Sequence, residues 1–288
     1  MPQGAAETGL VGYRPGPEGD DTVALVAALV APGARLIVAE VDLGSTRSGP
    51  ATGGEADDRL RAALEDLRRT YASVDHRKLM APPGLPAWEA TATALRAAAA
   101  EVAADLLVVG ATHRGPLARL LRRTLGDRIA QELPCALAVA PNGFAVSDRA
   151  GPPTVGVAFD GSPSAWSALA WARHWASLRD GTVRVVTVAE PSAMHHGAAL
   201  RTAAARTAEL GRRHEQALAS PGEVRLDGAM VHGDPGDVLI GLSDELDLIV
   251  CGSSSHGSVG QLLLGGVSHR LLADAACPVA IIPRPSDS

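Results

Sequence analysis

A glycine-rich segment near the carboxyl end of the chain has the composition of an anion-binding turn. Glycines stand at positions 252, 257, 260, 265 and 266, and Val267 and Ser268 follow them at the start of an expected helix. Glycine lets backbone N–H groups come close to an anion, and the first turn of a helix adds partial positive charge. The segment therefore predicts a phosphate-binding loop between residues 252 and 268.

The side chains that could carry out catalysis do not form a known catalytic arrangement. Ser254 and His256 offer a nucleophile and a base, but their sequence, GSSSHG, differs from the G-x-S-x-G elbow. His195 and His196 lack the helical i, i+4 spacing of a metal site. Lys78 is the only lysine, which excludes a Walker A loop. We therefore predict a protein without enzyme activity or a metal centre, and a hydrolase or transferase that depends on Ser254 or His256 is the competing hypothesis.

The composition excludes several classes of protein. Of the 288 residues, 46% are hydrophobic and 20% are charged, which is enough to bury a core. The net charge of −6 argues against a duplex-DNA binder, and 3% aromatic residues leave few rings to stack on single strands. No apolar run reaches the roughly 20 residues that cross a bilayer, and the first residues lack the pattern of a signal peptide. We expect a cytoplasmic protein with no membrane or nucleic-acid partner, and with reduced, buried thiols at Cys135, Cys251 and Cys277.

The chain contains an internal repeat. Residues 105–141 align without gaps to residues 247–283, with a constant offset of 142. Identity at glycine, cysteine and proline is difficult to obtain from shared helix propensity alone, so the alignment indicates a duplication. The identical positions in the first copy include Asp105, Gly110, Gly115, Leu120, Leu121, Arg128, Cys135 and Pro141.

Apolar runs alternate with segments of helical periodicity in both copies. Strands rich in Val and Ile that are separated by helices predict an α/β domain with a parallel sheet covered on both faces. In the second copy we expect strands at 154–159, 182–189, 223–231, 247–252 and 278–283, and helices near 163–178, 198–219, 235–245 and 261–275. In the first copy we expect strands at 9–13, 34–41, 73–80, 105–110 and 135–140. The turn-rich segment 141–153 separates two doubly wound domains, which we place at 1–146 and 152–288.

The position of a ligand follows from this fold class. Open parallel sheets bind ligands beyond the carboxyl ends of their strands, where the winding direction reverses. In the second domain this rule selects the turns at 160–163 and 188–191 and the glycine-rich segment 252–268. Asp160, directly after the first strand, is a candidate ligand residue, although an Asp at such a turn commonly caps the following helix.

These residues resemble the tandem universal stress proteins, which carry two universal stress domains in one chain. Nucleotide-binding members of that family have a Gly-x2-Gly-x9-Gly-Ser/Thr motif after the fourth strand and an Asp after the first. The resemblance implies two five-stranded domains of the adenine nucleotide alpha hydrolase-like fold, with strand order 3-2-1-4-5, related by a pseudo-twofold axis and paired through their last strands. It also implies ATP, ADP or AMP as ligand, with Mg²⁺ as a further candidate. The implied binding residues are Asp160, Val188, Gly252, Ser253, Ser255, Gly265, Gly266, Val267 and Ser268.

Both copies depart from the motif. In the second copy, Ser255 stands in place of the second glycine and Gly266 in place of the Ser or Thr, which predicts weakened binding. In the first copy, the positions of the second glycine, the third glycine and the Asp hold His113, Arg123 and Arg14. We expect the first site to be degenerate, because a side chain at a position of close backbone approach fills the pocket.

The sequence thus favours a stress-associated regulatory protein that binds an adenine nucleotide mainly in its second domain. The alternative is a protein-interaction module whose nucleotide pockets are vestigial. The sequence also leaves open a monomer with an internal pseudo-dimer or a homodimer. Titration with adenine nucleotides separates the first two hypotheses.

Overall fold

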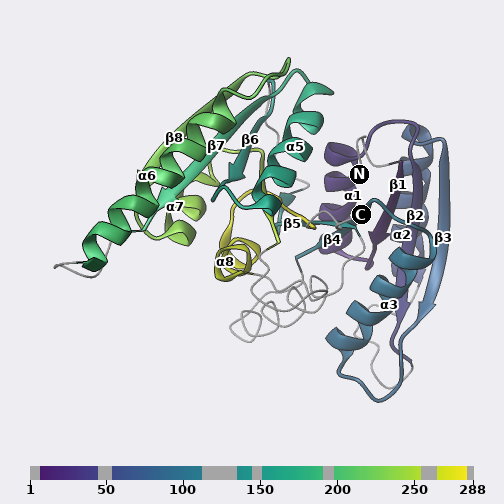
Figure 1. The fold of residues 1–288 in the computed structure, drawn as a ribbon. Helices are drawn as coiled ribbons and strands as arrows, with labels where there is room; N and C mark the ends of the chain where they lie inside the picture. The colour runs from purple at the N-terminus through teal and green to yellow at the C-terminus, as the bar shows by residue number, and fades with distance from the viewer. Residues whose placement is uncertain are drawn as a thin grey trace.

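The computed structural model describes residues 7–44, 54–111, 135–144, 151–190, 198–253 and 265–283. Its strands form one ten-stranded sheet in the order β3-β2-β1-β4-β5-β10-β9-β6-β7-β8. Figure 1 shows the two halves of the chain side by side, the first in purple and blue and the second in green and yellow.

The first half contributes strands β1 to β5, all parallel to one another. Its elements are β1 (Thr8–Gly12), α1 (Pro17–Leu29), β2 (Arg35–Asp42), α2 (Gly54–Thr70), β3 (Ser73–Met80), α3 (Ala87–Glu101), β4 (Leu106–Gly110) and β5 (Ala136–Ala140). The order β3-β2-β1-β4-β5 is the one expected for a universal stress domain. The central strands are buried on both faces, which explains their continuous apolar sequences.

The second half repeats this arrangement. Its elements are β6 (Thr154–Ala158), α5 (Pro163–Ser177), β7 (Thr182–Ala189), α6 (Ala198–Leu218), β8 (Leu226–His232), α7 (Pro235–Leu242), β9 (Leu248–Gly252), α8 (Gly266–Asp274) and β10 (Val279–Ile282). These strands are also parallel, in the order β10-β9-β6-β7-β8. The expected doubly wound α/β fold is therefore confirmed in both halves.

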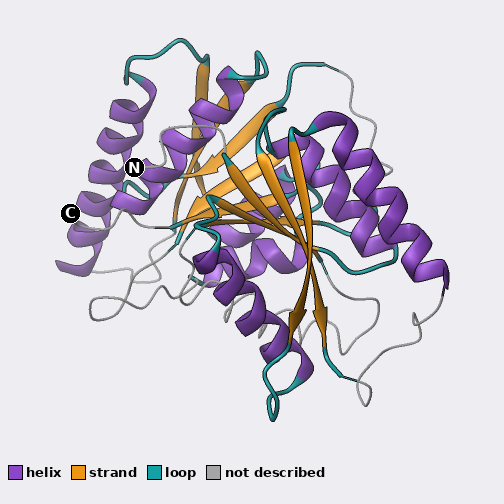
Figure 2. Cartoon of the chain, turned by 90° about the vertical axis from the view of Figure 1, so that its right-hand side faces the viewer, coloured by secondary structure: helices purple, strands orange, loops and turns teal. Residues whose placement is uncertain are grey.

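Helices cover both faces of the sheet, as Figure 2 shows. One apolar cluster joins one face of the strands to α1, α2, α5 and α6, and a second joins the opposite face to α3, α7 and α8. All three cysteines are buried free thiols, as expected. No helix within the described ranges is both long and apolar enough to span a membrane.

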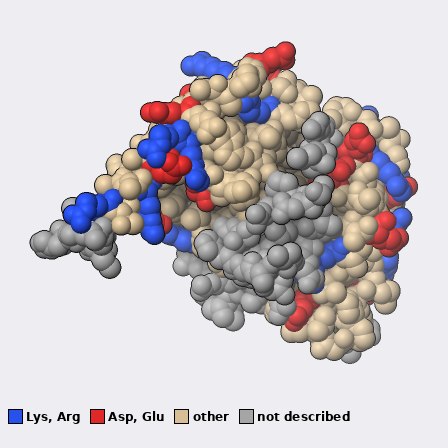
Figure 3. All heavy atoms as spheres, viewed as in Figure 1, with Lys and Arg blue, Asp and Glu red and all other residues tan. Residues whose placement is uncertain are grey.

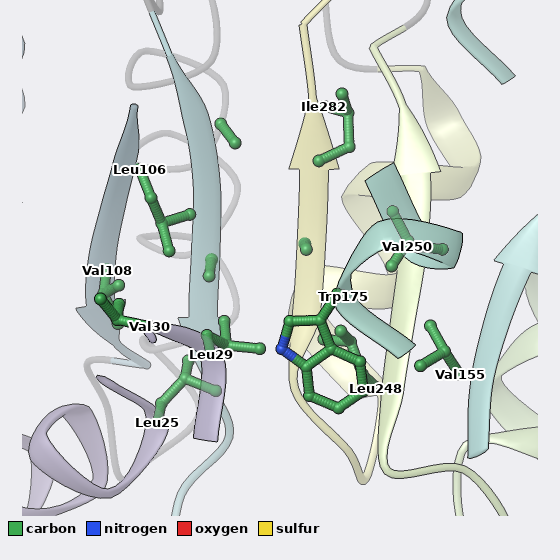
Figure 4. Close-up of a cluster of buried hydrophobic side chains, with 14 of the residues drawn as sticks. Leu25, Leu29, Val30, Leu106, Val108, Val155, Trp175, Leu248, Val250 and Ile282 are labelled. Carbon is green, nitrogen blue, oxygen red and sulfur yellow. The ribbon is translucent and has the colours of Figure 1, made fainter. Parts of the chain in front are cut away.

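The two halves meet along their last strands. β5 and β10 are antiparallel, with Val139 opposite Val279 and Leu137 opposite Ile281. This pairing confirms the expected contact through the last strands. The core continues across it: Figure 4 shows Leu29 of α1 directed toward Trp175 of α5, and both belong to the same apolar cluster.

An Asp of the internal repeat holds the first strand of each half through a hydrogen bond to its backbone. The carboxylate of Asp105 accepts the backbone N–H of Thr8 at 3.0 Å, and that of Asp247 accepts the N–H of Thr154 at 2.8 Å. Each Asp precedes the strand that pairs with β1 or β6. The repeated Asp is therefore a structural residue in both domains.

Candidate functional site

A cavity of about 790 Å³ lies at the carboxyl ends of β6, β7 and β9 in the second domain. This size is typical of a small-molecule site. Helices α5, α6, α7 and α8 complete its walls. The residues that line it are Ala158, Phe159, Asp160, Ser162, Ser164, Ala165, Val186, Val188, Ala189, Glu190, Thr202, Ala203, Arg206, Thr207, Leu210, Pro235, Leu239, Cys251, Gly252, Val267 and Ser268.

The structure brings most of the predicted binding residues to this cavity. Those that line it are Asp160, Val188, Gly252, Val267 and Ser268. Gly265 is the N-cap of α8 and Gly266 is its first residue, so both adjoin the lining residues. Ser253 is 3% exposed and follows β9 without lining the cavity. Ser255, Ser254, His256 and the pair His195–His196 lie outside the described residues.

Asp160 forms a local turn and does not cap the helix. Its Oδ1 accepts the N–H of Ser162 at 2.9 Å. The cap of α5 is Ser162 itself, whose Oγ accepts the N–H of Ala165 at 3.2 Å. Asp160 is exposed at the cavity, and no group in the described ranges donates to its Oδ2. One carboxylate oxygen therefore stays available to a ligand while the other holds the turn.

Gly252 serves the packing of α5 as well as lining the cavity. A Cβ added to Gly252 would lie 2.5 Å from the carbonyl carbon of Ser164. Gly110 holds the same place in the first domain, where a Cβ would lie 2.4 Å from the carbonyl oxygen of Glu18. The first motif glycine is therefore required by the close approach of a helix in both domains, with or without a ligand.

The α8 side of the cavity contains a buried thiol and a buried hydroxyl. Cys251 and Ser268 are each 3% exposed, and the Ser268 hydroxyl hydrogen-bonds to the Cys251 sulfur. Burial raises the pKa of Cys251 to about 11. The thiol thus stays protonated near neutral pH and is a weak nucleophile. The hydroxyl of Ser268, one of the implied binding residues, already has a partner in Cys251.

Residues of α6 form a wall that sequence reasoning missed. Thr202, Arg206 and Leu210 recur every fourth residue and therefore share the face of α6 that lines the cavity. Arg206 is the only cationic side chain among the described lining residues, where Asp160 and Glu190 are the acidic ones. The four-residue spacing was visible in the sequence, but nothing in it indicated which face of this helix lies over β7.

The start of α7 is fixed to α8 by charge. Asp234 caps α7 by accepting the N–H of Asp237 at 3.0 Å, and this bond is the main cause of the lowered pKa of Asp234. Arg270 of α8 forms ion pairs with both Asp234 and Asp237. The guanidinium also packs closely on Gly236, because a Cβ added there would lie 2.6 Å from the Arg270 Cζ. Arg270, one of the repeated residues, therefore has a structural role next to the cavity.

The corresponding end of the first domain has different chemistry. Tyr13 and Phe159 occupy equivalent places, because each donates its N–H to the neighbouring strand, to Ala39 and Val186 respectively, at 2.9 Å. The next residues are Arg14 and Asp160, so the charge is reversed. Burial and the nearby Asp20 and Glu40 raise the pKa of Tyr13 to about 12. The expected replacements His113 and Arg123 lie outside the described residues.

The sequence model of the universal stress protein family matches residues 10–141 and again residues 153–283. The chain belongs to this family. The two matches coincide with the two halves of the sheet, so the protein is a tandem universal stress protein.

The chain is also similar to individual universal stress proteins in sequence and in fold. A universal stress protein of Thermus aquaticus is 32% identical over 136 residues, which cover 45% of this chain and 97% of that protein. One from Mycobacterium tuberculosis is 28% identical over 148 residues, covering 44% of this chain and 47% of that protein. A solved universal stress protein from Archaeoglobus fulgidus aligns over 99% of both chains with a TM-score of 0.64 and 14% identity, which shows the shared fold.

Proposed function

We propose that this universal stress protein binds an adenine nucleotide, ATP or its products ADP and AMP, in the cavity of its second domain and acts as a stress-associated regulatory protein. The observation that carries the proposal is the convergence of Asp160, Val188 and the start of α8 on one cavity of about 790 Å³. A volume in this range accommodates a ligand of nucleotide size.

The chemistry of the walls suggests how the nucleotide would lie. Ala158, Val186 and Val188 offer an apolar surface for the base. Asp160 has a carboxylate oxygen available to accept from a ribose hydroxyl. The phosphates would lie toward the first turn of α8, where backbone N–H groups have no intrahelical partner, with Arg206 as a counter-charge. Mg²⁺ would bind to the phosphates, and it is tested below as a separate condition.

We propose binding without turnover. Efficient phosphate cleavage needs a positioned base or a concentrated positive charge to stabilise the transition state. The lining residues in the described part of the chain include no lysine or histidine, and their one thiol is held protonated by burial. Bound ATP should therefore stay intact for minutes, which chromatography of the released nucleotide would check.

We place the domains at residues 1–146 and 152–288 and propose that the first binds no nucleotide. The exposed Arg14 at the position of Asp160 removes the carboxylate that would accept from a ribose. A cytoplasmic location, the absence of a nucleic-acid partner and the choice between monomer and homodimer stay predictions. On the face seen in Figure 3, acidic and basic side chains are interspersed, and the described residues there form no single basic patch.

Calorimetric titration of the purified chain with ATP, ADP and AMP, each with and without Mg²⁺, tests the proposal. We expect one site per chain and a similar affinity for AMP if the base and ribose dominate recognition. Two equal sites would contradict the assignment to the second domain. No binding of any nucleotide would favour the alternative, an interaction module with vestigial pockets.

A further inference from the structure

A second cavity, of about 450 Å³, lies between the two domains. It shares no lining residue with the proposed nucleotide cavity and lies at the other end of α5, which contributes Ser164 to the first cavity and Trp175 to the second. Its walls come from α1, the turn after β5, the end of α5 and the segments before β9 and β10. The lining residues are Leu25, Ala28, Leu29, Pro141, Asn142, Gly143, Phe144, Gly151, Pro153, Trp175, Arg179, Leu246, Asp247, Ala276, Cys277 and Pro278.

Trp175 brings a hydrogen-bond donor without a partner to this cavity. The side chain is 6% exposed, and its indole Nε1 is buried with no acceptor among the described residues. Figure 4 shows the nitrogen on the side of the ring that faces Leu29 of the first domain. Buried N–H groups almost always have a partner, because an unsatisfied donor costs free energy. The indole therefore points to an acceptor that the described part of the chain does not supply.

Arg179 places a positive charge beside the same ring. Its Cζ lies 4.6 Å from the Trp175 ring centroid, and its Nη1 reaches the carbonyl oxygen of Trp175 at 3.5 Å. No carboxylate in the described ranges forms an ion pair with this partly buried guanidinium. Asp247 also lines the cavity, but its Oδ2 accepts the N–H of Thr154, a bond that Asp105 and Thr8 repeat in the first domain.

The Trp–Arg pair is particular to the second domain. Both α1 and α5 begin with proline, and counting from Pro17 and Pro163 places Leu29 at the position of Trp175. α1 ends at Leu29, whereas α5 continues to Ser177 and brings Arg179 to the cavity. The packing of the fold therefore does not require an indole or a guanidinium at this place, since a leucine serves in the first domain.

We propose that the interdomain cavity binds a small carboxylate with an apolar body. The carboxylate accepts from the Arg179 guanidinium and the Trp175 Nε1–H, and the body packs against Leu25, Leu29 and Phe144. A carboxylate fits better than a phosphate, because the mainly apolar walls offer one cation, Arg179, and already carry one carboxylate, Asp247, so a dianion would keep more charge uncompensated. Since the loop at Phe144 is held to α1 by the Gly143 N–H and the Asp21 carboxylate, at 2.9 Å, this side of the cavity is preformed.

Octanoate is a suitable probe, with octanol as its uncharged counterpart. We would follow the four indole N–H signals of the isotope-labelled full chain by proton–nitrogen correlation NMR, and identify that of Trp175 with Trp175→Phe. If that variant does not fold, substituting the other three tryptophans assigns the signal by exclusion. We expect octanoate to shift the Trp175 signal saturably and to bind about tenfold or more tightly than octanol, as a charge-assisted hydrogen bond implies.

Two arginine variants decide whether the charge at the cavity is responsible. Arg179→Gln should remove the preference for octanoate over octanol. Arg173→Gln is the matched control, because Arg173 lies on α5, just before Arg179 in the chain, and bonds to Ser220 and Pro221 outside the cavity. ATP should not compete with octanoate. An unmoved Trp175 signal, equal binding of octanoate and octanol, or an unchanged preference in Arg179→Gln would each overturn the proposal.

Discussion

In the described residues at the carboxyl edge of the sheet, the two domains share a backbone arrangement but carry opposite charges directly after the first strand. In both, the fourth strand ends in a glycine that a helix approaches too closely for any Cβ, at Gly110 and Gly252. In contrast, the first strand is followed by Arg14 in one domain and Asp160 in the other. The comparison teaches that a retained motif glycine reports the packing of the fold, whereas the charged residue after the first strand differs between the proposed ligand site and its repeat.

The largest expected effect concerns the shared glycine. Gly110→Ala and Gly252→Ala should each lower the free energy of unfolding by about 3 kcal/mol, because the new Cβ would overlap backbone atoms of Glu18 or Ser164. Urea denaturation measures this. Gly266→Ala is the control, since no described residue beyond its own helix and chain neighbours lies within 4 Å of the added Cβ, and it should change stability by less than about 0.5 kcal/mol. A loss of stability in Gly252→Ala but not in Gly110→Ala would contradict a packing role that the two domains share.

The second prediction concerns the reversed charge. Asp160→Asn keeps an oxygen to accept from the Ser162 N–H but removes the carboxylate charge. We expect nucleotide affinity to fall about 10- to 100-fold, the equivalent of roughly 1.5–3 kcal/mol for a hydrogen bond to a charged group. Calorimetry measures this loss, and Arg14→Gln should leave the affinity unchanged. A loss in Arg14→Gln that equals the loss in Asp160→Asn would remove the distinction between the domains.

A smaller effect is expected at the start of the helix that borders the cavity. Ser162→Ala removes the side-chain cap of α5 and should cost about 1 kcal/mol of stability. In the first domain, Gly16 at the start of α1 provides no side-chain bond, so α5 depends on its cap in a way that α1 does not. Ser167→Ala, on the same helix, removes only an exposed bond to the Pro163 carbonyl and should change little. Equal losses in the two variants would contradict this dependence.

The smallest expected effect is a difference in acid sensitivity. His214 of α6 is 6% exposed and hydrogen-bonds to Thr187 at 2.8 Å, and burial lowers its pKa despite the opposing influence of Glu215. Since the unfolded chain then binds the proton more tightly, this contribution to stability is complete above the unfolded pKa of about 6.5 and is lost as the pH falls below it.

The first domain has no histidine on α2, so acid should weaken the second domain selectively. Hydrogen exchange between pH 7 and pH 5 would compare the two sheets, and His214→Gln should flatten the response of β7. An equal acid response of β2 and β7 would rule out this role for His214.

The sequence was sufficient to predict the order of the elements but not all the walls of the site. The strands Ser73–Met80 and Thr182–Ala189 have the predicted bounds, because turn residues interrupt the apolar runs on both sides. α7 ends at Leu242, before the predicted residue 245. Asp244 and Glu245 are polar but are not helix breakers, so the sequence gave no clear signal for the end of this helix. The pattern of apolar and polar residues along the chain is enough to predict the type and order of these elements.

Contacts between residues far apart in the sequence were harder to predict. A glycine in the sequence does not reveal that Ser164 will approach it, nor does Ser162 reveal that it, rather than Asp160, caps α5. Arg206 was missed because the orientation of α6 over β7 depends on packing between distant segments. Whether Ser255 contacts the ligand stays a prediction.

The antiparallel seam between β5 and β10 also determines the stoichiometry of the molecule. Because one covalent chain supplies both strands, they meet at an effective concentration set by the short connection between the domains, so dilution does not separate them. Every seam therefore joins one first domain to one second domain, and pairs of like domains are not formed within the chain. Each copy can thus change its sequence independently while its neighbour continues to cover its last strand.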